Sequence, residues 1–209
     1  MQTQNKDSQS SITPSQALSM LKDGNKRFCD KQMVERDLHQ QISDTSGGQW
    51  PFAAIVSCID SRTSSELIFD QGIGDVFNAR IAGNFVNEDI LGSLEFACAA
   101  AGAKLIVVVG HSACGAIKGA CDHVELGNLT QLLAKIEPAV ASVCESHDFS
   151  DQSSANAELV QLVAEENVRR AVTDITERSS VLAELKENGS IDIVGGMYDV
   201  TSGVVTFLD

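Results

Sequence analysis

The sequence predicts an α/β fold, with a central and mainly parallel β-sheet flanked by helices. Short apolar runs alternate with longer helical patterns along most of the chain. One run, "KLIVVVG" at 104–110, is continuously apolar, which is typical of a parallel strand covered on both faces. The chain has 209 residues, of which 43% are apolar and 21% charged, as expected of a single domain with a sizeable core.

The first half of the chain predicts two helix–strand pairs after an N-terminal helix. Thr13, Pro14 and Gln16 supply an N-cap, a first-turn proline and a capping box, so a helix is expected at 13–28. Residues 29–48 are polar and poorly periodic, which favours an extended arm or loop. The elements expected next are a strand, a short helix, a second strand and a helix, at 51–60, 63–72, 75–84 and 88–102.

The second half predicts mostly helix and a closing hairpin. Helical patterns follow strand 104–110 at 112–125, 130–145 and 154–188, with Pro138 expected to break or kink the middle one. Residues 191–200 and 204–209, joined by Thr-Ser-Gly, are expected to form a closing strand and hairpin. Residues 1–11 are expected to be a disordered polar tail, and 12–209 a single domain.

Charge and hydropathy exclude several kinds of partner. The net charge is −14, from 29 acidic and 15 basic residues, which argues against binding to nucleic acid or to an anionic membrane. No apolar run approaches the roughly 20 residues of a membrane span. The N-terminus lacks the apolar segment of a secretion signal. A cytoplasmic location is expected, or a periplasmic one if a signal peptide has been removed.

Two glycine motifs do not meet the requirements of nucleotide binding. In "GHSACGAIK", Lys118 comes two places too late for a phosphate-binding loop. "GIGDVF" has Phe77 where a dinucleotide fingerprint needs its third glycine, and it precedes a strand.

Cysteine and histidine side chains end two of the predicted strands. Cys58 and Asp60 in "SCIDSR" lie at the end of strand 51–60, and His111 and Cys114 in "GHSAC" follow strand 104–110. The carboxyl ends of neighbouring parallel strands lie together, so Cys58, His111 and Cys114 are expected to converge. Two thiolates and an imidazole are good zinc ligands, and they leave a fourth position for chemistry.

The other residues of these motifs leave two arrangements open. Asp60 either takes the fourth zinc position and closes the site, or pairs with the Arg62 guanidinium and leaves that position to water. The open form is expected to be favoured at alkaline pH. Cys98 and Cys144 lie in apolar helical patterns and are interpreted as core residues.

"CIDSR" followed by "GHSACG" resembles the β-class carbonic anhydrases. "LKDGNKRF", "FDQGIGDVFNARIAGN" and "GGMYDVTSG" resemble the same family, so the similarity covers nearly the whole chain. The resemblance implies reversible hydration of carbon dioxide to bicarbonate and a proton, by zinc-bound hydroxide. It also implies one Zn²⁺ per chain and a homo-oligomer, either a dimer or a dimer of dimers, with residues 12–48 packing on the partner subunit.

The resemblance also implies a role for each site residue. Cys58, His111 and Cys114 would bind zinc, and Asp60 with Arg62 would orient the hydroxide and gate the fourth position. Gln71 would line the substrate pocket from the partner subunit, and Gly115 would let the backbone approach the site. His39 and His123 are conceivable proton shuttles. An allosteric bicarbonate site is not expected, because Ile55 lies on the strand and the nearest tryptophan is Trp50.

The sequence leaves two alternative functions open. The same site could hydrolyse carbon disulfide or carbonyl sulfide, because pocket access decides between linear substrates. The chain could also be a non-catalytic module stabilised by zinc, although such a module would need neither Asp60 nor Arg62. Ser64 stands where many family members have proline, which affects the stiffness of the loop and not the ligands.

Overall fold

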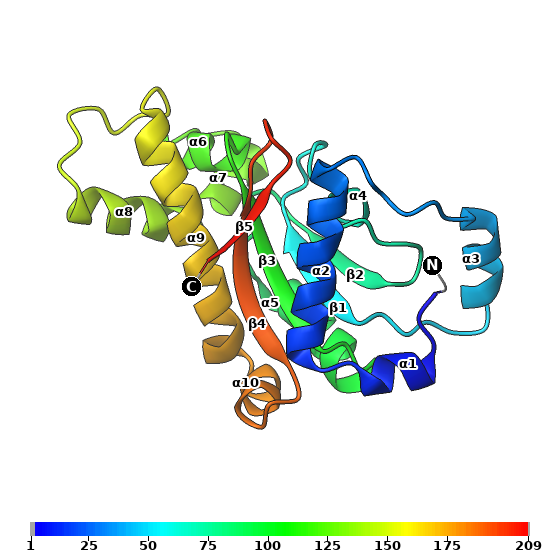
Figure 1. Cartoon of the computed structure of the whole chain (residues 1–209). Coiled ribbons are helices and arrows are strands. Elements are labelled where there is room, and N and C mark those ends of the chain that lie inside the picture. Colours follow the sequence, from blue (N-terminus) through cyan, green and yellow to red (C-terminus); the bar gives the residue numbers. More distant parts are fainter. Residues whose placement is uncertain (1–2, 209) are drawn as a thin grey trace.

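Five strands form one sheet in the order β2-β1-β3-β4-β5 in the computed structural model, which describes residues 3–208 (Figure 1). The parallel strands are β1 (Ala53–Ser57), β2 (Val76–Arg80), β3 (Leu105–His111) and β4 (Asp192–Tyr198). The last strand, β5 (Val205–Leu208), is antiparallel to β4. The predicted α/β class, the mainly parallel sheet and the closing hairpin are all confirmed.

Alternate residues of the central strands face two separate layers of helix. Leu105 and Val107 pack with α2 (Pro14–Cys29) on one face, while Ile106 and Val108 pack on the other face with the remaining long helices. Figure 1 shows α2 across one face and α9 along the other. The helices of the second layer include α5 (Glu88–Glu95), the π-helical segment η1 (Phe96–Ala100), α9 (Ala157–Arg178) and α10 (Ser180–Glu187).

The N-terminal segment is more ordered than the sequence predicts. Residues Lys6–Ser11 form helix α1, capped by Asn5, so the expected disordered tail is wrong for this part; residues 1 and 2 lie outside the described residues. The Gln9 side chain is buried because its amide donates to the carbonyls of Pro51 (2.7 Å) and Ala101 (2.8 Å). These tertiary bonds fix a segment whose composition is polar.

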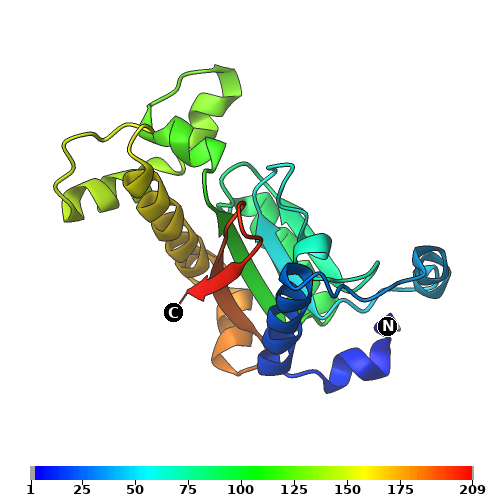
Figure 2. The same cartoon turned by 45° about the horizontal axis from the view of Figure 1, so that its top comes forward.

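The arm after α2 also contains a helix. Residues Leu38–Thr45 form α3, with Asp37 as its N-cap, where an extended arm or loop is expected from the sequence. The arm is fastened to the body by Asp70, whose buried carboxylate pairs with Arg36 and with Arg27 Nε (2.6 Å). Leu38 and Ile42 remain exposed on α3. The figures show α1 and α3 at one side of the molecule, away from the sheet (Figures 1 and 2).

The remaining helices are shorter than their sequence patterns. Of the helix expected at 112–125, only α6 (Gly115–Cys121) forms. It cannot begin at residue 112 because Ala113 adopts a positive φ of 54°. The break expected at Pro138 is confirmed, since the pattern divides into α7 (Gly127–Leu133) and α8 (Glu137–Ser146) with the proline in the first turn of α8. The short helix α4 spans Ser65–Ile68. Within residues 3–208, no helix combines the length and apolar character needed to cross a membrane.

Helix α2 joins the two ends of the chain. The buried Asn25 amide donates to the carbonyls of Ile68 (3.1 Å) and Gly203 (2.9 Å), and its oxygen accepts from the Val205 amide (2.8 Å). Gly24 lies so close to the segment after α4 that a Cβ there would overlap the carbonyl oxygen of Phe69. The close approach of the backbones therefore depends on a residue without a side chain at position 24.

Gly24→Ala is expected to destabilise the protein, although alanine favours helices, because the new methyl group meets backbone that cannot move aside. The free energy of unfolding in urea should fall by at least about 2 kcal/mol. Ser19→Ala places the same residue on the exposed side of α2 and should change stability by less than about 0.5 kcal/mol. Equal stability of the two variants would show that α2 does not approach the segment after α4 this closely.

Candidate metal centre

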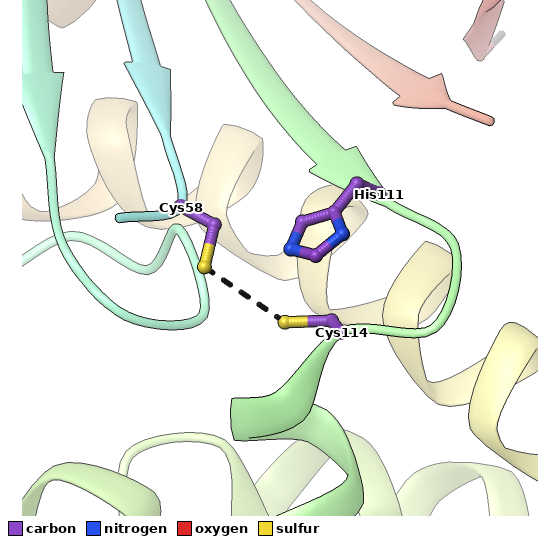
Figure 3. Close-up of side chains that lie close together, drawn as sticks. All are labelled: Cys58, His111 and Cys114. Carbon is purple, nitrogen blue, oxygen red and sulfur yellow. Dashed lines mark hydrogen bonds between the residues drawn. The ribbon is translucent and has the colours of Figure 1, made fainter. Parts of the chain in front are cut away.

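Two thiols and an imidazole meet where β1 and β3 end. Cys58 directly follows β1, His111 is the last residue of β3, and Cys114 is the N-cap of α6. The two strands are adjacent and parallel, with Ser57 in register with Val109, so the predicted convergence is confirmed. Figure 3 shows the three side chains pointing toward one another, and their donor atoms all lie within 4.8 Å of each other.

The spacing of these donor atoms suits a tetrahedral zinc ion. Two sulfurs bound to zinc at about 2.3 Å in a tetrahedron lie about 3.8 Å apart. The Sγ atoms of Cys58 and Cys114 are 3.9 Å apart. The third donor, His111 Nε2, is buried and has no hydrogen-bond partner among residues 3–208. A buried ring nitrogen without a partner is costly, and coordination to a metal would satisfy it.

The first of the two thiols ionises readily. The pKa of Cys58 lies below its ordinary value because Cys114 donates a hydrogen bond to its sulfur, with further donation from the Gly83 amide at 3.4 Å. The pKa of Cys114 is raised by the same thiolate and by burial. The pocket thus already stabilises one negative sulfur, and a cation bound there would favour the second thiolate as well.

Asp60 pairs with Arg62 beside the three donors. Arg62 Nε lies 2.9 Å from Asp60 Oδ1 and Nη2 lies 2.7 Å from Oδ2, so both carboxylate oxygens accept hydrogen bonds. These bonds hold the pKa of Asp60 well below its usual range. Asp60 Oδ2 is 3.9 Å from His111 Nε2. Of the two arrangements left open by the sequence, the structure contains the one in which the carboxylate binds Arg62.

Two residues that sequence analysis missed shape the loop carrying Asp60. Arg80 at the end of β2 donates to the carbonyls of Cys58 (3.0 Å) and Asp60 (2.6 Å). The buried Thr63 hydroxyl donates to the carbonyl of Cys58 at 3.0 Å or to that of Asp60 at 2.8 Å. The parallel register of Ser57 with Arg80 places this arginine, so the ends of adjacent strands are the feature that could have identified it.

Other predicted residues lie away from the three donors. The Gln71 side chain is buried against α2 and donates to the Phe69 carbonyl at 2.6 Å; within the described chain no contact joins it to the donor group. A Cβ at Gly115 would meet no atom within 4 Å, so nothing in a single chain requires glycine there. His123 lines a separate cavity with Glu137 and Cys144, and His39 is exposed on α3. The roles of these four residues stay predictions.

Comparisons with known proteins agree on one family. The family model described as carbonic anhydrase matches residues 53–205. The chain is 34% identical to carbonic anhydrase 2 of Mycobacterium tuberculosis, over 94% of this chain and 93% of the relative. It is 32% identical to a carbonic anhydrase of Mycolicibacterium smegmatis, with 92% of each chain covered.

Solved structures show the same fold. The β-carbonic anhydrase CafA of Aspergillus fumigatus superimposes with a TM-score of 0.71 at 28% identity, covering 93% of this chain and 90% of the other. A β-carbonic anhydrase of Sordaria macrospora, described as tetrameric, gives 0.73 at 27% identity over 81% and 88% of the two chains.

Cys114→Ser is expected to lower the zinc content well below one ion per chain, because a serine hydroxyl does not ionise at neutral pH and is a poorer ligand for zinc. The content is measured by mass spectrometry of the metal after gel filtration in zinc-free buffer. Cys144→Ser changes a free and partly exposed cysteine outside the donor group, so it should keep the zinc of the unmodified protein. Full zinc in the Cys114 variant would contradict the assignment.

Proposed function

The chain belongs to the β-class carbonic anhydrases, zinc enzymes that hydrate carbon dioxide reversibly to bicarbonate and a proton, and we propose that Cys58, His111 and Cys114 hold its zinc. One observation carries this assignment: two sulfurs and an unpartnered imidazole nitrogen converge at the ends of adjacent parallel strands, beside an Asp–Arg pair. Zinc in such a site lowers the pKa of its water to supply hydroxide, the effect known from carbonic anhydrases with three-histidine sites.

Asp60 orients the nucleophile in this proposal. Its carboxylate lies beside the position of the metal, with Oδ2 3.9 Å from His111 Nε2. As an acceptor it would take the hydrogen bond of a hydroxide held in this site and so direct the oxygen lone pair toward carbon dioxide. Arg62 holds the carboxylate in place through two hydrogen bonds, so that Asp60 would not itself become the fourth ligand of a bound zinc ion.

The pH dependence follows from this pairing. Because Arg62 lowers the pKa of Asp60, the carboxylate stays ionised through the pH range in which an aspartate usually titrates. It loses its charge only as the pH falls through the lowered pKa. Asp60 therefore does not titrate between neutral and alkaline pH. A hydration rate that rises over this range is assigned to ionisation of the nucleophile and not to Asp60.

The alternative substrates and the non-catalytic module are not favoured. The relatives reported above are named carbonic anhydrases, and the oriented Asp60–Arg62 pair has no use in a purely structural zinc site. A cytoplasmic location suits the proposal, since the six cysteines are all free thiols and two of them must stay reduced to bind metal.

We further propose that two chains complete the active site by packing the N-terminal arm of each on the other. Met33, Leu38 and Ile42 expose apolar side chains on the arm, which a second copy would cover. A cavity of about 630 Å³ lies along the edge strand β2 and α5, where Phe96 is 56% exposed. Gln71 from the partner would then line the substrate pocket, as the family resemblance implies.

Asp60→Asn is expected to reduce carbon dioxide hydration by at least about 100-fold at every pH, because the amide no longer serves as a charged acceptor. Zinc content and thermal stability should stay close to those of the unmodified enzyme. Hydration is measured by stopped flow from acidic to alkaline pH, with zinc determined on the same samples. Asp148→Asn, at an exposed position outside the site, is the matched control.

An unchanged rate in the Asp60→Asn variant would remove Asp60 from the mechanism. Full zinc with no hydration in the unmodified enzyme at any pH would instead contradict the proposed reaction.

Ile42→Glu is expected to shift the enzyme from a dimer or tetramer toward monomers, because a carboxylate would be buried against the partner. Molar mass is measured by light scattering after gel filtration. Val181→Glu makes the same change at an exposed position of α10, away from the arm, and should leave the mass unchanged. An oligomer that is equally stable in both variants would contradict packing of the arm on the partner subunit.

A further inference from the structure

The orientation of the His111 ring depends on one backbone carbonyl. His111 Nδ1 lies 3.0 Å from the carbonyl oxygen of Ser112. A carbonyl oxygen only accepts, so Nδ1 carries the proton and Nε2 is left as the nitrogen with a free lone pair. The same bond fixes the angle of the ring. A change in the direction of the Ser112 carbonyl would therefore change where Nε2 points.

This carbonyl belongs to a short turn between β3 and α6. Ala113, the next residue, has a φ of 54°, so the chain reverses direction immediately after Ser112. A two-residue turn next to a strand end is not held by the sheet alone. The end of β4 provides a first bond to Ser112, whose amide donates to the Tyr198 carbonyl at 2.9 Å.

The Ser112 side chain makes two further bonds to the same segment. Its hydroxyl donates to Asp199 Oδ1 at 3.3 Å and accepts from the Val200 amide at 3.0 Å. Both partners lie in the turn that joins β4 to β5. The main chain and the side chain of Ser112 are therefore both bonded to the segment 198–200.

Asp199 is itself held in place by hydrogen bonds within the β4–β5 turn. Its Oδ1 accepts from the Thr201 amide at 2.9 Å, and its Oδ2 accepts from the Ser202 hydroxyl at 2.8 Å. Its own amide and carbonyl bond to Val204 and Gly203 across the turn. The carboxylate thus cannot rotate away from Ser112 without breaking bonds of the turn.

We propose that Ser112 and Asp199 are positioning residues for the metal ligand His111: the Asp199–Ser112 bond holds the Ser112 carbonyl, which orients the imidazole toward the metal. Neither residue touches the metal position. The proposal rests on zinc ligation by His111 and goes beyond it, because it assigns a function to the turn between β4 and β5. Partners that orient metal-bound histidines typically change metal affinity by roughly 10- to 100-fold when removed.

The test compares zinc release from the loaded enzyme and three serine variants. Ser112→Ala removes the hydroxyl but keeps the carbonyl that binds Nδ1, and should release zinc to a chromophoric chelator about tenfold faster, the lower end of the effect for direct partners. Ser202→Ala removes a different hydroxyl bond to the same carboxylate and should release zinc at the original rate. Ser112→Thr keeps a hydroxyl and should restore slow release.

Cobalt substitution and a fourth variant complete the test. The absorption bands of the cobalt-loaded enzyme should change in Ser112→Ala and not in Ser202→Ala, since they report ligand geometry. Asp199→Asn leaves Ser112 intact, weakens its acceptor and should also speed zinc release. These readouts distinguish positioning from a general loss of stability, which thermal unfolding of each variant measures separately.

Two results would overturn the inference. The first is unchanged zinc release in both Ser112→Ala and Asp199→Asn; the second is equally faster release in Ser112→Ala and Ser202→Ala, which would indicate loosening of the turn alone. An unmodified enzyme that binds no zinc would overturn the proposed metal site as well, so failure of the inference and failure of the site are distinguishable.

Discussion

The parallel pairing of β1 with β3 is the constraint on which the site depends. It brings Cys58 next to His111, although the two residues are about fifty positions apart in the sequence, and the turn after β3 adds Cys114. A slip of one residue in this register would point every side chain of one strand to the opposite face and separate the donors. The apolar residues that alternate between the two helical layers therefore fix the geometry of the metal site as well as the core.

Charged groups around the site each hold a different part of it in position. Arg62 fixes the carboxylate, Arg80 fixes the backbone that carries it, and a network through the β4–β5 turn fixes the histidine. Each of these anchors comes from the carboxyl end of a different segment of the sheet. The donor atoms themselves are thus few, whereas the residues that hold them in position are spread over most of the strand order.

Much of this arrangement could be predicted from the sequence, and the failures have physical causes. The continuous apolar run before His111 identifies β3, and the two motifs identify the donors. Helix α3 was missed because it is short and mostly polar, with Leu38 and Ile42 as its only apolar residues. The network of Ser112 could not be predicted, since it depends on the register of β3 with β4 and not on local spacing.

The bonds of Asn25 join two segments of the chain that are synthesised far apart in time. Its partners Gly203 and Val205 come 178 and 180 residues later in the chain, so α2 emerges from the ribosome long before the strand that completes its binding site exists. The Asn25 side chain therefore lacks these two partners until translation is nearly finished, although the apolar side of α2 can already pack on β1 and β3. Truncation before Gly203 would leave α2 its packing on β1 and β3 but would remove two of the three hydrogen bonds that Asn25 makes to Ile68, Gly203 and Val205.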